Sequence, residues 1–72
     1  MTTTTATAHA YRLGRESAQQ CAPELLEPWD ASTTPMLEGD HCELRDAYHP
    51  TQQEWRELDA EYQAGWNSVV SA

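Results

Sequence analysis

The clearest hydrophobic pattern in the sequence lies near its C-terminal end, between residues 51 and 69. Apolar and aromatic residues recur there every three or four positions, which is the spacing of one helix face: Trp55, Leu58, Tyr62, Gly65 or Trp66, and Val69. The intervening polar residues fall on the opposite face. Thr51 and Glu54 form the T-x-x-E pattern of a capping box at its start. The pattern therefore predicts a helix over residues 51–69.

A second helical pattern lies near the N-terminal end of the chain. Spacings of three, four and three place four residues on one face: Tyr11, Gly14, Ala18 and Cys21. Thr7 is a suitable cap, and Pro23 stops the helix because the residue before a proline avoids the helical region. We therefore predict a helix over 7–20. A glycine on the inward face costs helix propensity, so Gly14 indicates close approach of another backbone.

The first seven residues hold no aromatic or branched aliphatic side chain that could be buried. We therefore predict a disordered tail over 1–7 and a single small domain over 8–72. A chain this short buries only about 60% of the surface that its unfolded form exposes, so its stability margin is narrow.

The segment from Cys21 to Asp40 is interrupted by three prolines and Gly39. We interpret it as an ordered linker with two brief helical turns. In the first, PELLEPW, the apolar side chains would lie against the core: Leu25, Leu26 and Trp29. In the second, STTPMLEGD, Thr34 is the expected cap and Pro35 the first helical residue.

A short helix is predicted to follow the linker, over residues 40–48. Asp40 is its expected cap and Glu43 the reciprocal partner at the third position, and His49-Pro50 closes the segment. Strict alternation of apolar and polar residues, which would indicate a strand, is absent from the sequence. The expected fold is therefore all-α: a helical hairpin or three-helix arrangement with a long C-terminal helix and a proline-rich linker.

Charge narrows the classes of partner. Twelve acidic residues face four arginines, with no lysine, which gives a net charge of −8. A field of this sign repels phosphate and favours basic surfaces, so direct nucleic-acid binding is not expected. The alternative is that the acidity only confers solubility. The sequence also contains neither a long apolar span nor a secretory signal, so we expect a cytoplasmic protein whose Cys21 and Cys42 are free thiols.

An internal similarity joins the two outer helical segments. Residues 11–17 and 62–68 both follow the pattern Y-x-x-G-x-x-S. On a helix this spacing sets an aromatic side chain beside a glycine notch, so two such helices could cross at Gly14 and Gly65. The alternative is coincidence or ordinary packing, since two copies are too few for a repeat architecture.

The same residues resemble those of a known family. Tyr-x-x-Gly near the start, a proline-containing connection and aromatic-x-x-Gly-Trp near the end resemble the ribosome modulation factor family and its small relatives. Here these elements are Tyr11 and Gly14, then His49-Pro50 or Ala22-Pro23, then Tyr62, Gly65 and Trp66. The resemblance implies a pair of helices that binds the ribosome and silences it. Members of the family are basic, whereas this chain is acidic, and their Cys-Pro-Tyr element is not reproduced here.

Residue types that bind metals or act as nucleophiles are present without a typical spacing. The candidate ligands are Cys21, His41, Cys42 and His49, but no C-x-x-C or H-x-x-x-H pair exists, and we expect no metal or other cofactor. Cys42 lies beside His41, but its other charged neighbours in the sequence are mostly acidic, which does not favour a thiolate nucleophile, and we expect no enzymatic activity.

Six tryptophans and tyrosines in so short a chain supply either a core or a recognition surface. Our leading hypothesis is a small acidic modulator or inhibitor that occupies a basic, nucleic-acid-binding surface of a larger protein or nucleoprotein complex. It resembles in style, though not in motif, phage-encoded inhibitors such as anti-CRISPR proteins. The expected partner-binding residues are Glu54, Glu57, Asp59, Glu61, Tyr62, Trp66, Asp40 and Glu43. The alternatives are a ribosome-binding factor of the modulation type and a homodimer that buries the Trp55–Val69 stripe.

Overall fold

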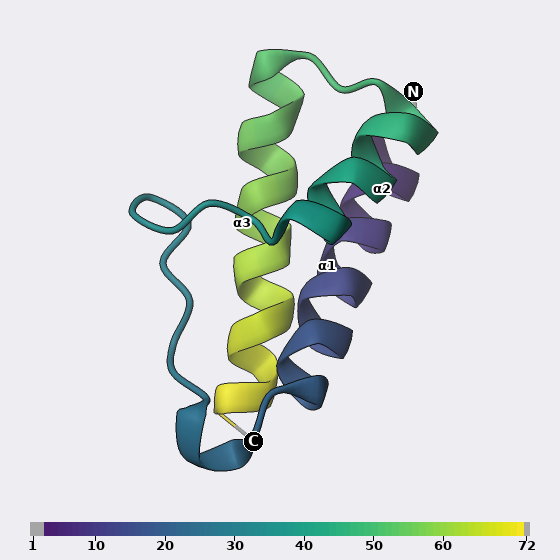
Figure 1. The fold of residues 1–72 in the computed structure, drawn as a ribbon. Coiled ribbons are helices and arrows are strands. Elements are labelled where there is room, and N and C mark those ends of the chain that lie inside the picture. The colour runs from purple at the N-terminus through teal and green to yellow at the C-terminus, as the bar shows by residue number, and fades with distance from the viewer. Residues whose placement is uncertain (1–2, 72) are drawn as a thin grey trace.

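The computed structural model describes residues 3–71, and that part of the chain is all-α, as the sequence predicts. The α-helices are α1 (Thr3–Gln20), α2 (Glu38–Tyr48) and α3 (Gln52–Val70), and a short 3-10 helix, η1 (Pro23–Leu25), follows α1. Helices α1 and α3 lie side by side and run in the same direction (Figure 1). The linker after η1 runs along α3 and crosses it, and α2 then packs over the pair, so both lie on one side of α1 and α3 (Figure 1).

Helix α3 begins as its sequence predicts. The Glu54 amide donates to Thr51 Oγ1 at 3.2 Å, and the Thr51 amide donates to Glu54 Oε1 at 2.9 Å. The capping box is thus complete. The hydrogen bonds from the backbone and then the side chain of Thr51 lower the pKa of Glu54. The helix continues to Val70, one residue beyond the predicted end.

Helix α1 begins earlier than predicted, at Thr3 rather than Thr7. The reason is that small side chains in this segment are buried: Ala6 is 5% and Ala10 0% exposed, and both belong to the core cluster. The structure thus places residues 3–7 in α1, where the sequence predicts a disordered tail, and residues 1 and 2 lie outside the described part of the chain. An alanine has little to bury by itself, but it allows another helix to approach closely.

The linker differs from the prediction in both of its expected turns. The first forms as η1, but Leu25 is 71% exposed instead of lying against the core. The second, with Thr34 as cap and Pro35 as its first residue, does not form; a turn forms earlier, where the backbone carbonyl of Asp30 accepts from the amides of Thr33 and Thr34. The Asp30 carboxylate also accepts from the hydroxyl and amide of Ser32, which lowers the pKa of Asp30.

Two amide side chains of α3 hold the linker. Asn67 accepts from the Trp29 amide at 2.7 Å and donates to the Trp29 carbonyl at 3.1 Å. Gln63 Oε1 accepts from the Ala31 amide at 2.8 Å. The polar face that the sequence predicts for α3 is therefore partly in contact with the linker. Its amide side chains hydrogen-bond to linker backbone groups that have no partner within a helix or strand.

Helix α2 begins at Glu38, two residues before the predicted start, and Asp40 is not its cap. The N-cap position is Leu37, with no side-chain hydrogen bond, and Asp40 lies within the first turn. The helix ends at Tyr48, as predicted, with His49 in the left-handed region at φ 47° and its amide donating to Arg45 O at 2.9 Å.

The left-handed conformation of His49 leads to a stability prediction. A side chain at positive φ is strained, whereas glycine is not, and His49 is exposed. We expect His49→Gly to raise the free energy of unfolding by about 0.5–1 kcal/mol and His49→Val to lower it by at least as much. Urea denaturation followed by circular dichroism would measure both. A less stable glycine variant would show that the imidazole contributes a contact that outweighs the strain.

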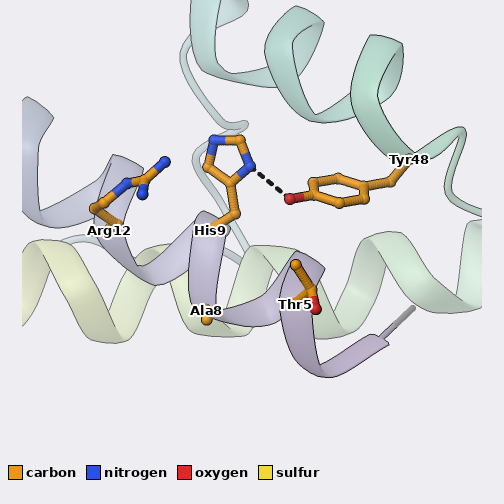
Figure 2. Close-up of a pocket in the computed structure, with 5 residues that line it drawn as sticks. All are labelled: Thr5, Ala8, His9, Arg12 and Tyr48. Carbon is orange, nitrogen blue, oxygen red and sulfur yellow. Dashed lines mark hydrogen bonds between the residues drawn. The ribbon is translucent and has the colours of Figure 1, made fainter. Parts of the chain in front are cut away.

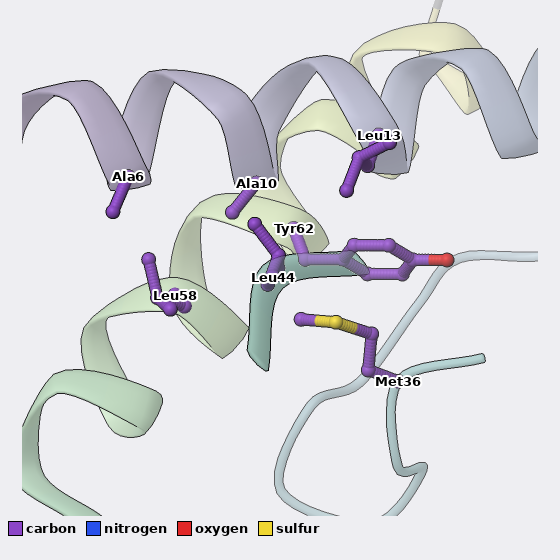
Figure 3. Close-up of a cluster of buried hydrophobic side chains, with 7 residues drawn as sticks. All are labelled: Ala6, Ala10, Leu13, Met36, Leu44, Leu58 and Tyr62. Atoms are coloured by element: carbon purple, nitrogen blue, oxygen red, sulfur yellow. The ribbon is translucent and has the colours of Figure 1, made fainter. Parts of the chain in front are cut away.

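The core lies between α1, α3 and the elements that cover them. Its buried members are Ala6, Ala10, Leu13, Met36, Leu44, Leu58 and Tyr62 (Figure 3). The ring of Tyr62 lies between Leu13 of α1 and Met36 of the linker (Figure 3). Three aromatic side chains pack around this cluster and are partly buried: Trp29, Tyr48 and Trp55.

Helices α1 and α3 cross at their glycines, which is one of the two interpretations of the Y-x-x-G similarity. A Cβ added to Gly14 would overlap the backbone carbonyl of Tyr62, and one added to Gly65 would overlap that of Tyr11. Small residues four apart allow this approach along α1: Ala6, Ala10, Gly14 and Ala18. The two contacts are reciprocal, and the helices are parallel. A local twofold axis that runs between the helices, in their direction, therefore relates the two Tyr-x-x-Gly segments.

Candidate interaction surface

The covered side of the α1/α3 pair is organised around Asp40. Its Oδ2 accepts from Tyr62 Oη at 2.7 Å and from Ser17 Oγ at 2.6 Å, so one carboxylate of α2 joins all three α-helices. Burial raises the pKa of the Tyr62 phenol, and the hydrogen bond to Asp40 raises it further. Asp40 is therefore engaged inside the fold rather than presented to a partner.

Two of the aromatic residues expected to bind a partner belong to the interior. Tyr62 is 0% and Trp66 8% exposed. Trp66 Nε1 donates to the carbonyl of Glu27 at 2.7 Å, and the ring of Trp29 lies 4.7 Å from Trp66 and 5.3 Å from Tyr62 between ring centroids. Both side chains are therefore engaged inside the fold, where they contact the linker.

Glu43 also makes a contact within the fold. Its Oε2 lies 2.6 Å from His9 Nε2, and His9 Nδ1 lies 2.8 Å from the Tyr48 hydroxyl, so His9 of α1 connects two residues of α2. Figure 2 shows His9 pointing toward Tyr48, with Arg12 one helical turn away. The expected partner role of Glu43 therefore competes with its contact to α1.

Asp59 lies at the contact between α2 and α3. The imidazole of His41 stacks on Trp55, with ring centroids 4.2 Å apart and an interplanar angle of 8°. Burial raises the pKa of Asp59, and the nearby His41 lowers it. Asp59 is half-buried, as Glu61 is, but it lies on the side of α3 that faces α2, so it is poorly placed to face a partner.

Three of the expected residues lie together on the other side of α3. Glu54, Glu57 and Glu61 are three and four residues apart and thus follow one edge of the helix. Glu57 is two residues, or about 200°, from both Trp55 and Asp59, so it points away from α2. Glu57 is exposed, and Glu54 and Glu61 are partly exposed. We call these three residues the acidic stripe.

The acidic stripe is not neutralised within the fold. Across residues 3–71, the ion pairs of the arginines join Arg12 to Glu16 and Arg45 to Asp46, and none involves the stripe. Glu54 is engaged in the capping box, whereas Glu57 and Glu61 make no hydrogen bond to another described side chain. These two carboxylates are therefore available to a partner.

Tyr11 lies on the same side of the α1/α3 pair as the acidic stripe, although it was not among the residues expected to bind a partner. His9 and Ser17 of α1 face α2. Tyr11 is two residues, or about 200°, from His9, which turns it away from α2. Its side chain is half-exposed, and its backbone lies against Gly65 of α3. The Tyr-x-x-Gly match with Tyr62 is the signal that could have singled it out.

The candidate metal ligands and cysteines of the sequence do not come together within residues 3–71. No three His, Cys, Asp or Glu side chains gather to hold a metal ion within residues 3–71. Cys21 and Cys42 are not paired with each other, and Cys42 Sγ accepts from Arg45 at 3.7 Å. Within the same residues, the helices are too short or too polar to cross a membrane.

Comparison of the chain with known protein families, with curated proteins and with solved structures gives no match.

Proposed function

We propose that this chain is a small acidic modulator or inhibitor that occupies a basic, nucleic-acid-binding surface of a larger protein or nucleoprotein complex. The observation that supports it is the acidic stripe. Asp40 and Glu43 make hydrogen bonds within the fold, and Asp59 is partly buried near His41 of α2, whereas Glu57 and Glu61 lie on the side of α3 turned away from α2.

The stripe has the charge sign and rigidity needed to replace phosphates on a basic surface. Successive stripe residues are about 4.5 and 6 Å apart along the axis, and the helix holds this spacing fixed. A single exposed ion pair contributes little, so the three carboxylates act as a set. The net charge of −8 also accelerates encounter with a basic surface. The proposal places the protein in the cytoplasm and gives it neither catalytic activity nor a cofactor.

The test is a charge change confined to the stripe. Glu54→Gln keeps the capping box, since glutamine also serves at this position. It is combined with Glu57→Lys and Glu61→Lys. We expect the triple variant to capture at least roughly tenfold less partner, because several charge pairs are lost together. The measurement is a tagged pull-down from nuclease-treated lysate, with salt elution and quantitative mass spectrometry.

A charge-matched control separates the stripe from the overall charge. Glu16→Gln with Glu24→Lys and Glu27→Lys changes the net charge by the same amount at exposed positions outside the stripe. This variant should retain the partner. Equal capture by the wild type and both variants, all folded by circular dichroism, would refute the proposal. Equal loss in both would show that overall charge, rather than the stripe, governs binding.

A ribosome-binding factor of the modulation type is the second candidate. It is favoured by one observation: the two segments that resemble that family pack on each other through Gly14 and Gly65. This candidate predicts that the tagged protein co-sediments with ribosomes in a sucrose gradient, whereas the first predicts that it stays in the upper fractions unless its partner is ribosomal. Tyr62 and Trp66 are core residues, so their substitution would test folding rather than ribosome binding.

The structure gives little support to the homodimer hypothesis, in which a second copy would bury the apolar stripe of α3. Most of the apolar stripe of α3 is already buried within one chain: Leu58, Tyr62, Gly65 and Trp66.

A further inference from the structure

The local symmetry of the α1/α3 pair gives it two comparable sides, of which one is covered. On the covered side, Tyr62 projects from the helix crossing and donates to Asp40 of α2. Leu44 of α2 is 0% exposed on the same side. Here α2 is a short amphipathic helix that lies over the pair (Figure 1). The hydrogen bond from Tyr62 to Asp40 anchors it there.

On the opposite side, Tyr11 occupies the position related to Tyr62. Both tyrosines precede the crossing glycine of their helix by three residues, and each backbone lies against the glycine of the other helix. Tyr62 is 0% exposed, whereas Tyr11 is half-exposed. Ala64 and Ser68 of α3, which continue the edge of the acidic stripe, are also exposed. Within residues 3–71, no helix covers Tyr11 as α2 covers Tyr62.

We propose that the side carrying Tyr11 is the docking site for a basic amphipathic helix of the partner, with Tyr11 as its aromatic anchor. This inference rests on the proposed function, and it adds the anchor and the secondary structure of the partner segment. The acidic stripe borders the site and selects lysine or arginine at spacings of three and four residues, which a helix presents along one edge. The apolar edge of the same helix would cover Tyr11 and Ala64.

Charge excludes a second copy of this chain as the occupant. Each copy carries a net charge of −8. Its arginines offer one pair at helical spacing, Arg12 and Arg15 of α1, against the three carboxylates of the stripe, and Arg45 and Arg56 lie on other helices. A basic helix instead neutralises Glu57 and Glu61, and it supplies apolar surface to the half-exposed phenol, which is a typical anchor residue at interfaces.

A synthetic peptide serves as the probe. It has about five helical turns and is built from arginine, leucine and alanine, with the arginines along one edge and the leucines along the adjoining edge. Titrated into the 15N-labelled full chain, it should shift the backbone amides of Tyr11, Arg15, Glu61 and Ala64, and leave those of α2 in place. A peptide of the same composition in scrambled order should bind roughly tenfold more weakly. Equal affinity for both peptides, with shifts spread over all acidic segments, would overturn the inference.

Variants separate this inference from the proposed function. Tyr11→Ala and Ala64→Gln should each weaken peptide and partner binding, by roughly tenfold for the loss of the aromatic anchor. Ala47→Gln is the matched control, since Ala47 is exposed on α2. If the stripe variant loses the partner while Tyr11→Ala and Ala64→Gln retain it, the docking site is wrong and the proposed function stands. If the stripe variant also retains the partner, the proposed function fails.

Discussion

Replacement of both Gly14 and Gly65 by alanine is expected to unfold the protein. At each position the added Cβ would overlap a backbone carbonyl, of Tyr62 or Tyr11, and a backbone atom cannot move aside as a side chain can. The helices must therefore separate, which loosens the packing of Leu58 and Tyr62 as well. Each single substitution is expected to cost about 2 kcal/mol or more, although alanine is the better helix former. A domain of this size has a total stability of roughly 5 kcal/mol, so the two together remove most of it.

Gly39→Ala provides the matched control. Gly39 lies in α2, and a Cβ added there would have no atom within 4 Å. The same chemical change is therefore expected to raise the free energy of unfolding by about 0.5–1 kcal/mol through helix propensity alone. Urea denaturation followed by tryptophan fluorescence would compare the variants. If Gly14→Ala were as stable as Gly39→Ala, the close crossing of α1 and α3 would be wrong.

Leu44→Ala is expected to release α2 from the helix pair. Leu44 is 0% exposed and is the buried residue of α2, whose other attachments are polar contacts through Asp40 and Glu43 and the stacking of His41 on Trp55. Truncation of a fully buried leucine costs about 2–5 kcal/mol. We expect faster hydrogen exchange in α2 than in α1 and α3, together with a lower free energy of unfolding.

Leu25→Ala is the corresponding control on the surface. Leu25 is 71% exposed, so its truncation should change the free energy of unfolding by less than about 0.5 kcal/mol. Uniform acceleration of exchange in all three α-helices of the Leu44 variant would indicate that α2 unfolds only with the whole domain.

The sequence determined the local structure that depends on short-range contacts. The capping box of Thr51 and Glu54 and the unbroken apolar spacing after it predicted α3 nearly to the residue. His49-Pro50 marked the end of α2 because the residue before a proline avoids the helical region. The repeated Tyr-x-x-Gly pattern indicated that the helices could cross at Gly14 and Gly65, with coincidence or ordinary packing as the alternative, and the structure has the crossing there.

Tertiary structure decided which side chains remain at the surface. Tyr62 and Tyr11 have the same local pattern, yet α2 and the linker cover one and leave the other half-exposed. Asp40 has the pattern of a cap, but it serves instead as an acceptor for Ser17 and Tyr62, which lie more than twenty residues away in either direction. Helical spacing fixes the direction of a side chain on its own helix. Whether that direction leads to water or to another element depends on contacts between distant segments, and the acidic stripe could be separated from the structural carboxylates only once those contacts were known.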